Sequence, residues 1–213
     1  MKIKVEIDND VRLLWSTPIF HRIWPGSSDL NSRLRRIILD QERKHAGPRK
    51  SVVGGWHSPE DFLAWPYPEV THLKERMIEG ISAVMLPTFG RKPGQYNLNG
   101  EISAWANVLR RGGYHRVHSH PGSFWSGVYY IGVGQMDPGP DENGVIELFD
   151  PRGAVEMVSV PENPFGQRMI FRPEPGLMLV FPSWLRHAVT PYMGTGERIT
   201  VAFNLSVASL SFT

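Results

Sequence analysis

Two histidines separated by one residue are the feature of this chain best suited to metal chemistry. They lie in the segment His118-Ser119-His120-Pro121. If the backbone is extended there, side chains at positions i and i+2 point to the same face of the strand. One strand end can then present two imidazoles to a single metal ion. A turn before Pro121 that holds two ordinary histidines is the alternative for this pair taken alone.

A third histidine, His187, lies 69 positions after His118 and follows the apolar segment 177–181. A turn, an apolar strand and a loop would bring His187 back over the first pair in a rolled sheet. Three protein ligands that leave coordination positions open are typical of a catalytic metal site, because water or substrate can occupy those positions. The spacing therefore predicts a metal site formed by His118, His120 and His187.

Arg198 follows His187 by eleven positions and lies on the last predicted strand. A guanidinium near a metal can bind the far carboxylate of a dicarboxylate that chelates the metal. Residues 198, 200, 202 and 204 share one face of this strand, which is small and polar, and 199, 201, 203 and 205 share an apolar face. The polar face suits the lining of an open cavity, although an edge strand with that face in water is also possible.

The elements that must position these residues change character along the chain. Apolar residues at helical spacing predict amphipathic helices over about 29–45 and 68–86, the second stopped by Pro87. Between them, Gly54-Gly55-Trp56 is interpreted as a flexible turn. Ser58-Pro59-Glu60-Asp61 is interpreted as a helix start with serine at the N-cap.

After Gly100 the sequence favours strands separated by Gly, Pro, Asp and Asn clusters. The predicted strands are residues 102–111, 124–131, 145–149, 167–172, 177–181 and 198–207, after a first strand at 11–20. None of the later strands is followed by a crossover helix, so the sheet should be largely antiparallel. We therefore expect a single domain, 1–213, with a helical part at 1–100 and a β core at 101–213. Its class is α+β, mainly β, with the helices packed outside the sheet.

The composition excludes several classes of function. Twenty-three basic and 21 acidic residues give a net charge of +2, which gives no argument for nucleic acid or membrane binding. The chain has no cysteine, so disulfides and thiolate chemistry are excluded. It has neither a long apolar segment nor a signal-peptide core at its start. We expect a soluble, cytoplasmic protein, and a homodimer is compatible with the sequence.

Six motifs together carry a resemblance to a known family. They are Trp105-Ala106-Asn107, His118-Ser119-His120-Pro121, Ser126-Gly127-Val128-Tyr129-Tyr130, Asp150-Pro151-Arg152, the segment from Phe181 to His187, and the segment from Arg198 to Asn204. The set resembles a bacterial and phage group of Fe(II)/2-oxoglutarate-dependent oxygenases. The resemblance covers roughly residues 100–207, and the N-terminal part matches only through Thr17-Pro18-Ile19 and Gly55-Trp56.

The resemblance implies a double-stranded β-helix, a jelly-roll or cupin-like fold, with Fe(II) as cofactor and 2-oxoglutarate as cosubstrate. It implies hydroxylation of a further substrate, a small molecule or a peptide. His118 and His187 take the places of the two histidine ligands, and Arg198 takes that of the basic residue that binds the distal carboxylate of 2-oxoglutarate. Tyr130 takes the place of a hydroxyl donor to the same carboxylate.

His120 stands where this superfamily usually has Asp or Glu, so the site departs from the usual triad of two histidines and one carboxylate. Imidazole must be neutral to bind a metal, and its reference pKa is about 6.5. A site with three histidines is therefore expected to lose its metal as the pH falls below that value.

Other residues are assigned to the pocket. Asn204 is expected to hydrogen-bond the cosubstrate, and Asn107, Trp125 and Trp184 to line the substrate side. His115 differs in parity from His118, so in an extended segment it should point away from the metal.

Three other functions remain open from the residues alone. They are a three-histidine cupin-type metalloprotein that works without 2-oxoglutarate, a zinc hydrolase or lyase, and a non-enzymatic scaffold with exposed histidines. A cupin would have a glutamate where Phe124 and Trp125 stand, and its last histidine would follow Gly176 more closely than His187 does. Arg198 has no role in a zinc hydrolase. The sequence therefore favours the oxygenase.

Overall fold

The computed structural model describes residues 16–213 except 49, 139–141, 158–165 and 167. Its described part forms a nine-stranded sheet with the order β1-β7-β4-β9-β3-β8-β5-β6, and β2 pairs with β3 beside this path. The strands are β1 (Phe20–Ile23), β2 (Val52–His57), β3 (Tyr96–His118), β4 (Trp125–Met136), β5 (Ile146–Phe149), β6 (Arg168–Phe171), β7 (Leu177–Pro182), β8 (His187–Val189) and β9 (Gly194–Phe212). Every pairing between named strands is antiparallel, as predicted.

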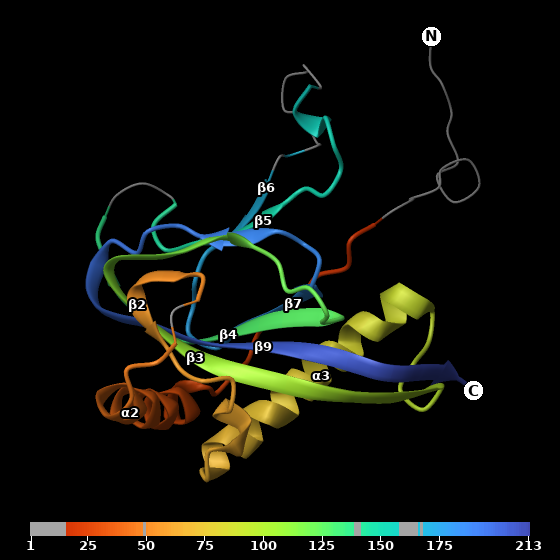
Figure 1. Cartoon of the computed structure of the whole chain (residues 1–213), viewed down its shortest axis with the longest axis horizontal. Helices are drawn as coiled ribbons and strands as arrows, with labels where there is room; N and C mark the ends of the chain where they lie inside the picture. The colour runs from red at the N-terminus through yellow and green to blue at the C-terminus, as the bar shows by residue number, and fades with distance from the viewer. Residues whose placement is uncertain (1–15, 49, 139–141, 158–165, 167) are drawn as a thin grey trace.

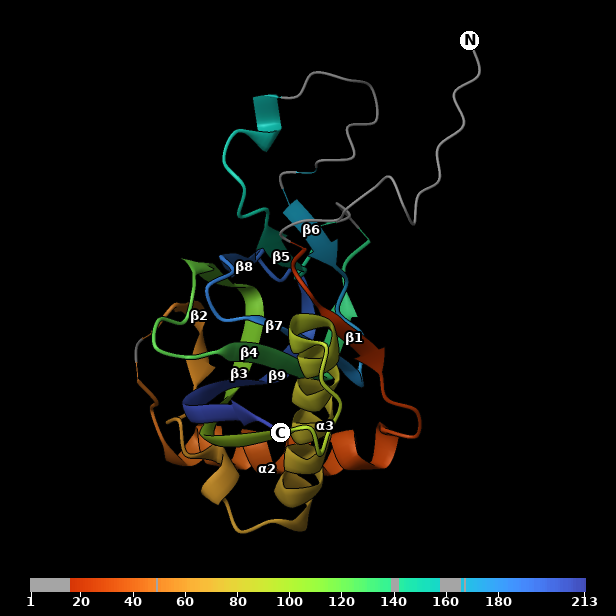
Figure 2. The same cartoon turned by 90° about the vertical axis from the view of Figure 1, so that its right-hand side faces the viewer.

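The sheet curls because β3 takes part in two layers. Residues 96–109 of β3 pair with β9, whereas His115 and His118 pair with β8. The strand changes direction at Gly112, whose φ of 83° lies in the left-handed region that glycine adopts without a steric cost. The strands β8, β5 and β6 therefore lie over the broad layer of β7, β4, β9 and β3 (Figures 1 and 2).

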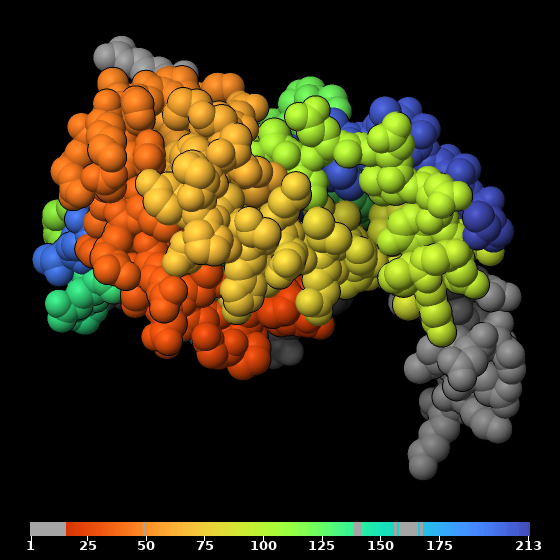
Figure 3. Space-filling model, turned by 90° about the horizontal axis from the view of Figure 1, so that it is seen from below, coloured from red at the N-terminus to blue at the C-terminus, as the bar shows by residue number. Residues whose placement is uncertain are grey.

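Two helices, α2 (Ser28–Lys44) and α3 (Pro68–Phe89), cover the outer face of the broad layer (Figures 1 and 3). Their apolar faces and the sheet enclose one hydrophobic core. Ile199, Val201, Phe203 and Leu205, the predicted apolar face of β9, are buried in that core. The alternation of this strand is confirmed, because its polar residues point to the opposite face.

The first helix has the predicted extent, but Pro87 does not stop the second. Pro87 lies in the last turn of α3, which continues to Phe89. A proline so close to the C-terminus removes one amide donor without interrupting a long hydrogen-bonded segment. The helix ends at Gly90, which has a φ of 65° and donates its amide to the carbonyl of Leu86 at 2.7 Å.

The interpretation of Gly54-Gly55-Trp56 as a turn is wrong, because these residues belong to β2. Val53 pairs with Tyr114 and Gly55 pairs with Leu109, so a bulge lies between them at Gly54, whose φ is 66°. A Cβ atom on Gly55 would lie 2.5 Å from Leu109 Cδ2. Glycine is needed here so that β2 can approach β3 closely.

The helix start predicted at Ser58 is also wrong, and only a 3-10 turn, η1 (Phe62–Ala64), follows. Ser58 Oγ donates to the Pro59 carbonyl at 2.6 Å and accepts the amide of Ala106 at 3.0 Å. The hydroxyl that would have capped a helix is thus used to attach this segment to β3.

The N-terminal part contains more β structure than predicted. It includes β1 and β2, and β3 begins at Tyr96 rather than after residue 100. Half of the strand predicted at 11–20 lies outside the described residues, and within the other half only Phe20 belongs to a strand, at the start of β1. No described helix is long and apolar enough to span a membrane.

Candidate active site

The end of β3 and the start of β8 bring the three histidines together. His118 lies directly opposite His187 in the antiparallel register of these strands. Two residues beyond β3, the backbone amide of His120 donates to the carbonyl of Ser183 at 2.9 Å, which fixes the loop that carries this histidine. Residues 69 positions apart thus meet at one end of the curled sheet.

The geometry of the three rings suits one metal ion. The ring centroids of His118 and His187 are 4.3 Å apart, those of His118 and His120 are 5.0 Å apart, and those of His120 and His187 are 5.2 Å apart. One nitrogen from each ring lies within 4.8 Å of the others. Three imidazoles so close together are a ligand set for a divalent transition metal.

Backbone carbonyls determine which nitrogen of two rings is available. His118 Nδ1 lies 2.7 Å from the carbonyl of Arg116, and His187 Nδ1 lies 2.9 Å from that of Leu185. A carbonyl oxygen can only accept, so both Nδ1 atoms carry a proton. Each neutral ring then has its lone pair on Nε2, in the arrangement that orients metal-binding histidines.

The surroundings keep all three rings neutral. Burial lowers the pKa of His118, lowers that of His120 to about 4 and lowers that of His187 to about 3. A proton on His118 would lower the pKa of His120 and of His187 further. Neutral rings are the form that binds a metal, so the site is prepared for one at neutral pH.

Arg198 is a buried cation without a carboxylate partner among the described residues. Its side chain is 1% exposed. Its Nε donates to the carbonyl of Gly144 at 3.0 Å, and one Nη donates to the hydroxyl of Tyr130 at 3.3 Å. Because a buried charge is costly unless it is paired, this guanidinium calls for an anion. The Tyr130 hydroxyl accepts from Arg198 and keeps its own proton for another acceptor.

A cavity joins Arg198 to the three histidines. Its walls come from β3, β4, β7, β8 and β9 and include Trp105, Asn107, His115, Ser126, Tyr130, Phe181, Thr200 and Ala202. Arg198, Thr200 and Ala202 lie in its wall, so the prediction that this face of β9 lines a cavity is confirmed. Asn107 is 3% exposed, and its Oδ1 has no hydrogen-bond partner among the described residues.

His115 also lines the cavity, contrary to the parity argument. His115 pairs with Val189 and His118 pairs with His187, so three steps on β3 correspond to two on β8. This bulge returns His115 to the side of the strand that His118 occupies. Its ring stacks on that of His118 with centroids 6.3 Å apart. The only local sequence signal for the bulge is the glycine pair that precedes it, Gly112-Gly113.

The remaining predicted pocket residues have different positions. Asn204 is the next residue after Ala202 on the cavity face of β9, but it is not part of the cavity wall. Its Oδ1 accepts a hydrogen bond from the hydroxyl of Ser126 at 2.7 Å. Trp184 is 55% exposed in the turn between β7 and β8.

The prediction for Trp125 is wrong: the side chain is buried in the core between sheet and helices. The alternation of β4 explains this, because Ser126 and Tyr130 share the cavity face and Trp125 points away.

Trp105 is a cavity residue that sequence reasoning missed. Its ring lies 5.7 Å from that of His120 and stacks on that of His57 at 5.5 Å. It lies two residues before Asn107 on β3, so the parity of the strand was the signal that could have found it.

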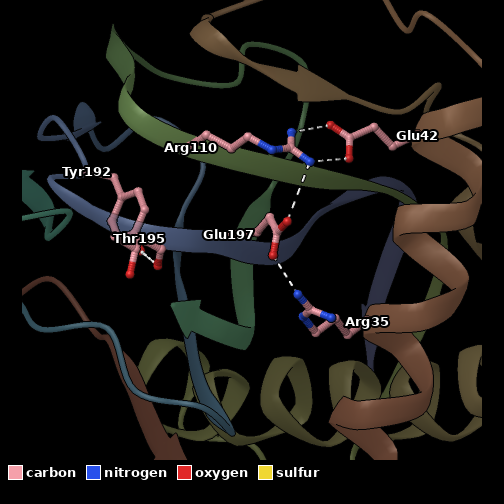
Figure 4. A network of polar contacts seen from close by, with 6 residues as sticks. All are labelled: Arg35, Glu42, Arg110, Tyr192, Thr195 and Glu197. Atoms are coloured by element: carbon pink, nitrogen blue, oxygen red, sulfur yellow. Dashed lines mark hydrogen bonds and ion pairs between the residues drawn. The ribbon is translucent and has the colours of Figure 1, made fainter. Parts of the chain in front are cut away.

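Ion pairs on the outer surface fix the start of β9 beside Arg198 (Figure 4). Glu197 pairs with Arg35 of α2 at 2.6 Å and with Arg110 of β3 at 3.7 Å. Arg110 also makes two hydrogen bonds to Glu42 of α2, at 2.6 and 2.9 Å. Each pair is partly exposed and contributes little alone, but the network holds three elements together next to the buried guanidinium.

Comparisons with known proteins agree with this geometry. A family model described as "Putative 2OG-Fe(II) oxygenase" matches residues 103–204, which include all three histidines and Arg198. No curated protein matches the chain. A prolyl-4-hydroxylase from Pseudomonas putida has a similar structure, with a TM-score of 0.61, 14% identity and coverage of 92% of this chain and 96% of that one.

Two further solved structures share the architecture. HygX from Streptomyces hygroscopicus, with nickel and 2-oxoglutarate bound, has a TM-score of 0.57 at 11% identity and covers 90% of this chain and 84% of its own. SnoK, a non-haem α-ketoglutarate-dependent carbocyclase from nogalamycin biosynthesis, has a TM-score of 0.62 at 13% identity, with 92% and 82% covered. The predicted double-stranded β-helix is confirmed by these likenesses.

Proposed function

We infer that this chain belongs to the 2OG-Fe(II) oxygenases and is an enzyme that uses Fe(II) and 2-oxoglutarate to oxidise a further substrate. The observation that carries this conclusion is the buried Arg198, which faces the same cavity as the three histidines and has no carboxylate partner among the described residues. A three-histidine metal site alone would also suit a cupin or a zinc enzyme. Neither of these explains an unpaired guanidinium in the wall of the cavity.

The residues of the cavity fit both Fe(II) and 2-oxoglutarate. His118, His120 and His187 would hold the iron through neutral imidazole nitrogens, and His120 takes the place of the usual carboxylate ligand. Arg198 and the Tyr130 hydroxyl would bind the distal carboxylate of 2-oxoglutarate, which supplies the missing anion. Bound there, Fe(II) supplies O₂ chemistry that couples oxidation of 2-oxoglutarate to succinate and CO₂ with hydroxylation of the substrate.

The cavity walls contribute orientation and exclusion of water. Backbone carbonyls hold the rings of His118 and His187 in fixed orientations, so no rearrangement is needed when a ligand binds. Phe181 and Val128 line the cavity beside the polar groups and limit the access of water. Asn107 and Trp184 are proposed for the substrate side, and Asn204 is proposed to act on the cosubstrate through Ser126.

The substrate class is part of the proposal. The similar structures include prolyl hydroxylases, which supports a peptide, and HygX and SnoK, which support a small molecule. A cytoplasmic location and a homodimer also remain proposals, which fractionation and sedimentation would test.

The test combines metal analysis with product analysis. The protein purified with Fe(II) should contain one iron per chain and should release succinate from 2-oxoglutarate in the presence of O₂. His187→Ala should contain no stoichiometric iron and release no succinate. A wild-type protein that holds iron but forms no succinate with any substrate screened, and does not bind 2-oxoglutarate, would favour the cupin-type function.

A further inference from the structure

His115 is a polar cavity residue that the proposed metal site does not use. The bulge in β3 turns it into the cavity, where it is 8% exposed. A buried imidazole keeps its place only if its polar atoms find partners, because an unpaired polar group in a protein interior is costly. The imidazole of His115 should therefore have a hydrogen-bond partner in the cavity.

His115 lies in the wall of the cavity that the metal ligands and Arg198 also line. Its ring stacks on His118 on one side. His115, Arg198 and the three histidines all line the same cavity, so a ligand that extends from the histidines to Arg198 crosses the cavity that His115 lines.

The contacts of His115 leave one donor unused. Ser51 Oγ lies 3.5 Å from Nδ1, and within the described residues Nε2 has no hydrogen-bond partner. When Ser51 donates to Nδ1, the neutral ring carries its proton on Nε2. Arg198 is a cation in the wall of this cavity, and among the described residues no acidic side chain lines it. Its surroundings therefore suit an anionic acceptor.

We propose that His115 Nε2–H donates a hydrogen bond to the distal carboxylate of 2-oxoglutarate and forms a third contact beside Arg198 and Tyr130. The proposal rests on the proposed function, because it assumes that 2-oxoglutarate occupies the cavity. It makes His115 a specificity-determining residue, which selects 2-oxo acids that carry a second carboxylate over those that do not.

The experiment measures binding rather than turnover. Titration calorimetry gives the affinities of 2-oxoglutarate and of pyruvate, a 2-oxo acid without the distal carboxylate, for the Ni(II)-loaded protein. A hydrogen bond to a charged group corresponds to a loss of about tenfold to a hundredfold in affinity when it is removed. His115→Phe should weaken 2-oxoglutarate by that factor and leave pyruvate and the nickel content unchanged. His115→Gln, whose amide can donate from a similar position, should restore most of the affinity.

The controls separate this proposal from the function on which it rests. His57→Phe replaces a buried histidine that lies outside the cavity wall and should not change the affinity for 2-oxoglutarate. Unchanged 2-oxoglutarate affinity in His115→Phe, with affinity lost in Arg198→Met, would overturn the role of His115 alone. Equal losses for 2-oxoglutarate and pyruvate would also overturn it. A wild-type protein that does not bind 2-oxoglutarate would overturn both proposals. If His115→Phe does not fold, His115→Leu takes its place with the same outcomes.

Discussion

Arg198 shows at the residue scale how burial and charge together point to a ligand. Its guanidinium is almost completely buried and faces a cavity, and its hydrogen-bond acceptors among the described residues are two neutral groups. Charged side chains that are fully buried in folded proteins are almost always paired with a counterion. The missing counterion is therefore more informative than any contact that the residue makes.

Replacing Arg198 by alanine should weaken 2-oxoglutarate binding and leave metal binding intact. A buried charge-assisted hydrogen bond contributes about 1.5–3 kcal/mol, so the loss should be roughly tenfold to a few hundredfold. Isothermal titration of the metal-loaded protein measures it, with Arg43→Ala as a control that removes an exposed arginine of α2. Equal affinities for 2-oxoglutarate in Arg198→Ala and in the wild type would remove the main support for the oxygenase.

The ligand histidines should respond differently to substitution. His118→Ala and His187→Ala should each abolish stoichiometric iron binding, because two remaining imidazoles hold a divalent ion weakly. His120→Asp should retain iron, because a carboxylate restores the usual triad. Metal content after dialysis measures this, and His21→Ala, outside the site, is the control. Full iron content in both alanine variants would place the metal elsewhere.

The sequence predicted the residues whose chemistry is decisive and missed those whose direction depends on local backbone geometry. The three histidines, Arg198 and Tyr130 follow from residue type, spacing and resemblance, and the structure brings all of them to one cavity. His115 was misplaced because a bulge in β3 is invisible to a parity argument. Trp125 was misplaced although the parity of its strand, taken from Tyr130, would have directed it to the core.

At the scale of elements, β4 shows how closely the sheet is packed around the site. A Cβ atom on Gly127 would lie 2.2 Å from the Phe203 ring, whereas a Cβ atom on Gly132 of the same strand would meet no atom within 4 Å. The two glycines thus provide a matched pair in one strand. The first is required by packing and the second is not.

Gly127→Ala should destabilise the protein by about 1–3 kcal/mol through overpacking against Phe203, whereas Gly132→Ala should be close to neutral. Chemical denaturation of the two variants measures the difference. A Gly127→Ala variant as stable as Gly132→Ala would contradict the close approach of β4 and β9.

Long periodic elements were predictable, and elements created by tertiary contacts were not. α2, α3 and β9 follow from their own apolar patterns. β2 contains two glycines and has no intrinsic strand pattern, so it forms only because β3 supplies its partner. The three-residue β8 is also set by its pairing with β3, which places His187 opposite His118.

At the scale of the whole molecule, the histidine cluster links stability to pH. Burial lowers the pKa of His120 to about 4 and of His187 to about 3 in the folded chain, whereas an unfolded chain titrates near the reference value of about 6.5. Between these values the unfolded state binds more protons than the folded state. The free energy of unfolding is therefore not reduced by these histidines above about pH 6.5. It falls progressively as the pH falls towards their folded-state pKa values.

The melting temperature of the metal-free protein should accordingly fall as the pH is lowered from 7 to 4.5. His187→Gln cannot be protonated at this position, so its melting temperature should fall less steeply. Calorimetry at several pH values compares the two slopes. Identical slopes would show that His187 is not held neutral by the fold.

The same values move the pH at which the three-histidine site is expected to lose iron. Protons compete for a ligand only near the pKa that the ligand has in the folded protein. For His120 and His187 that point is about 4 and about 3. Metal retention should therefore persist to a more acidic pH than the reference pKa of imidazole implies.

That residues 1–213 form one domain stays a prediction. The described helices pack on the broad layer of the sheet (Figure 1). Their core and the cavity are lined by opposite faces of β9. Arg76 of α3 donates to the hydroxyl of Tyr129, while the adjacent Tyr130 accepts from Arg198 on the other face. The helical layer and the cavity thus share one strand as their common wall.

The dependence of 2-oxoglutarate binding on the metal tests most directly whether the histidine-bound metal and Arg198 bind this cosubstrate together. Titration calorimetry without O₂ compares the Fe(II)-loaded protein with the metal-free protein. We predict one 2-oxoglutarate bound per chain in the loaded protein and binding at least tenfold weaker in the metal-free protein, because the histidine cluster and Arg198 would then hold opposite ends of one ligand. Equal affinity in both forms, or no binding to the loaded form, would contradict the account.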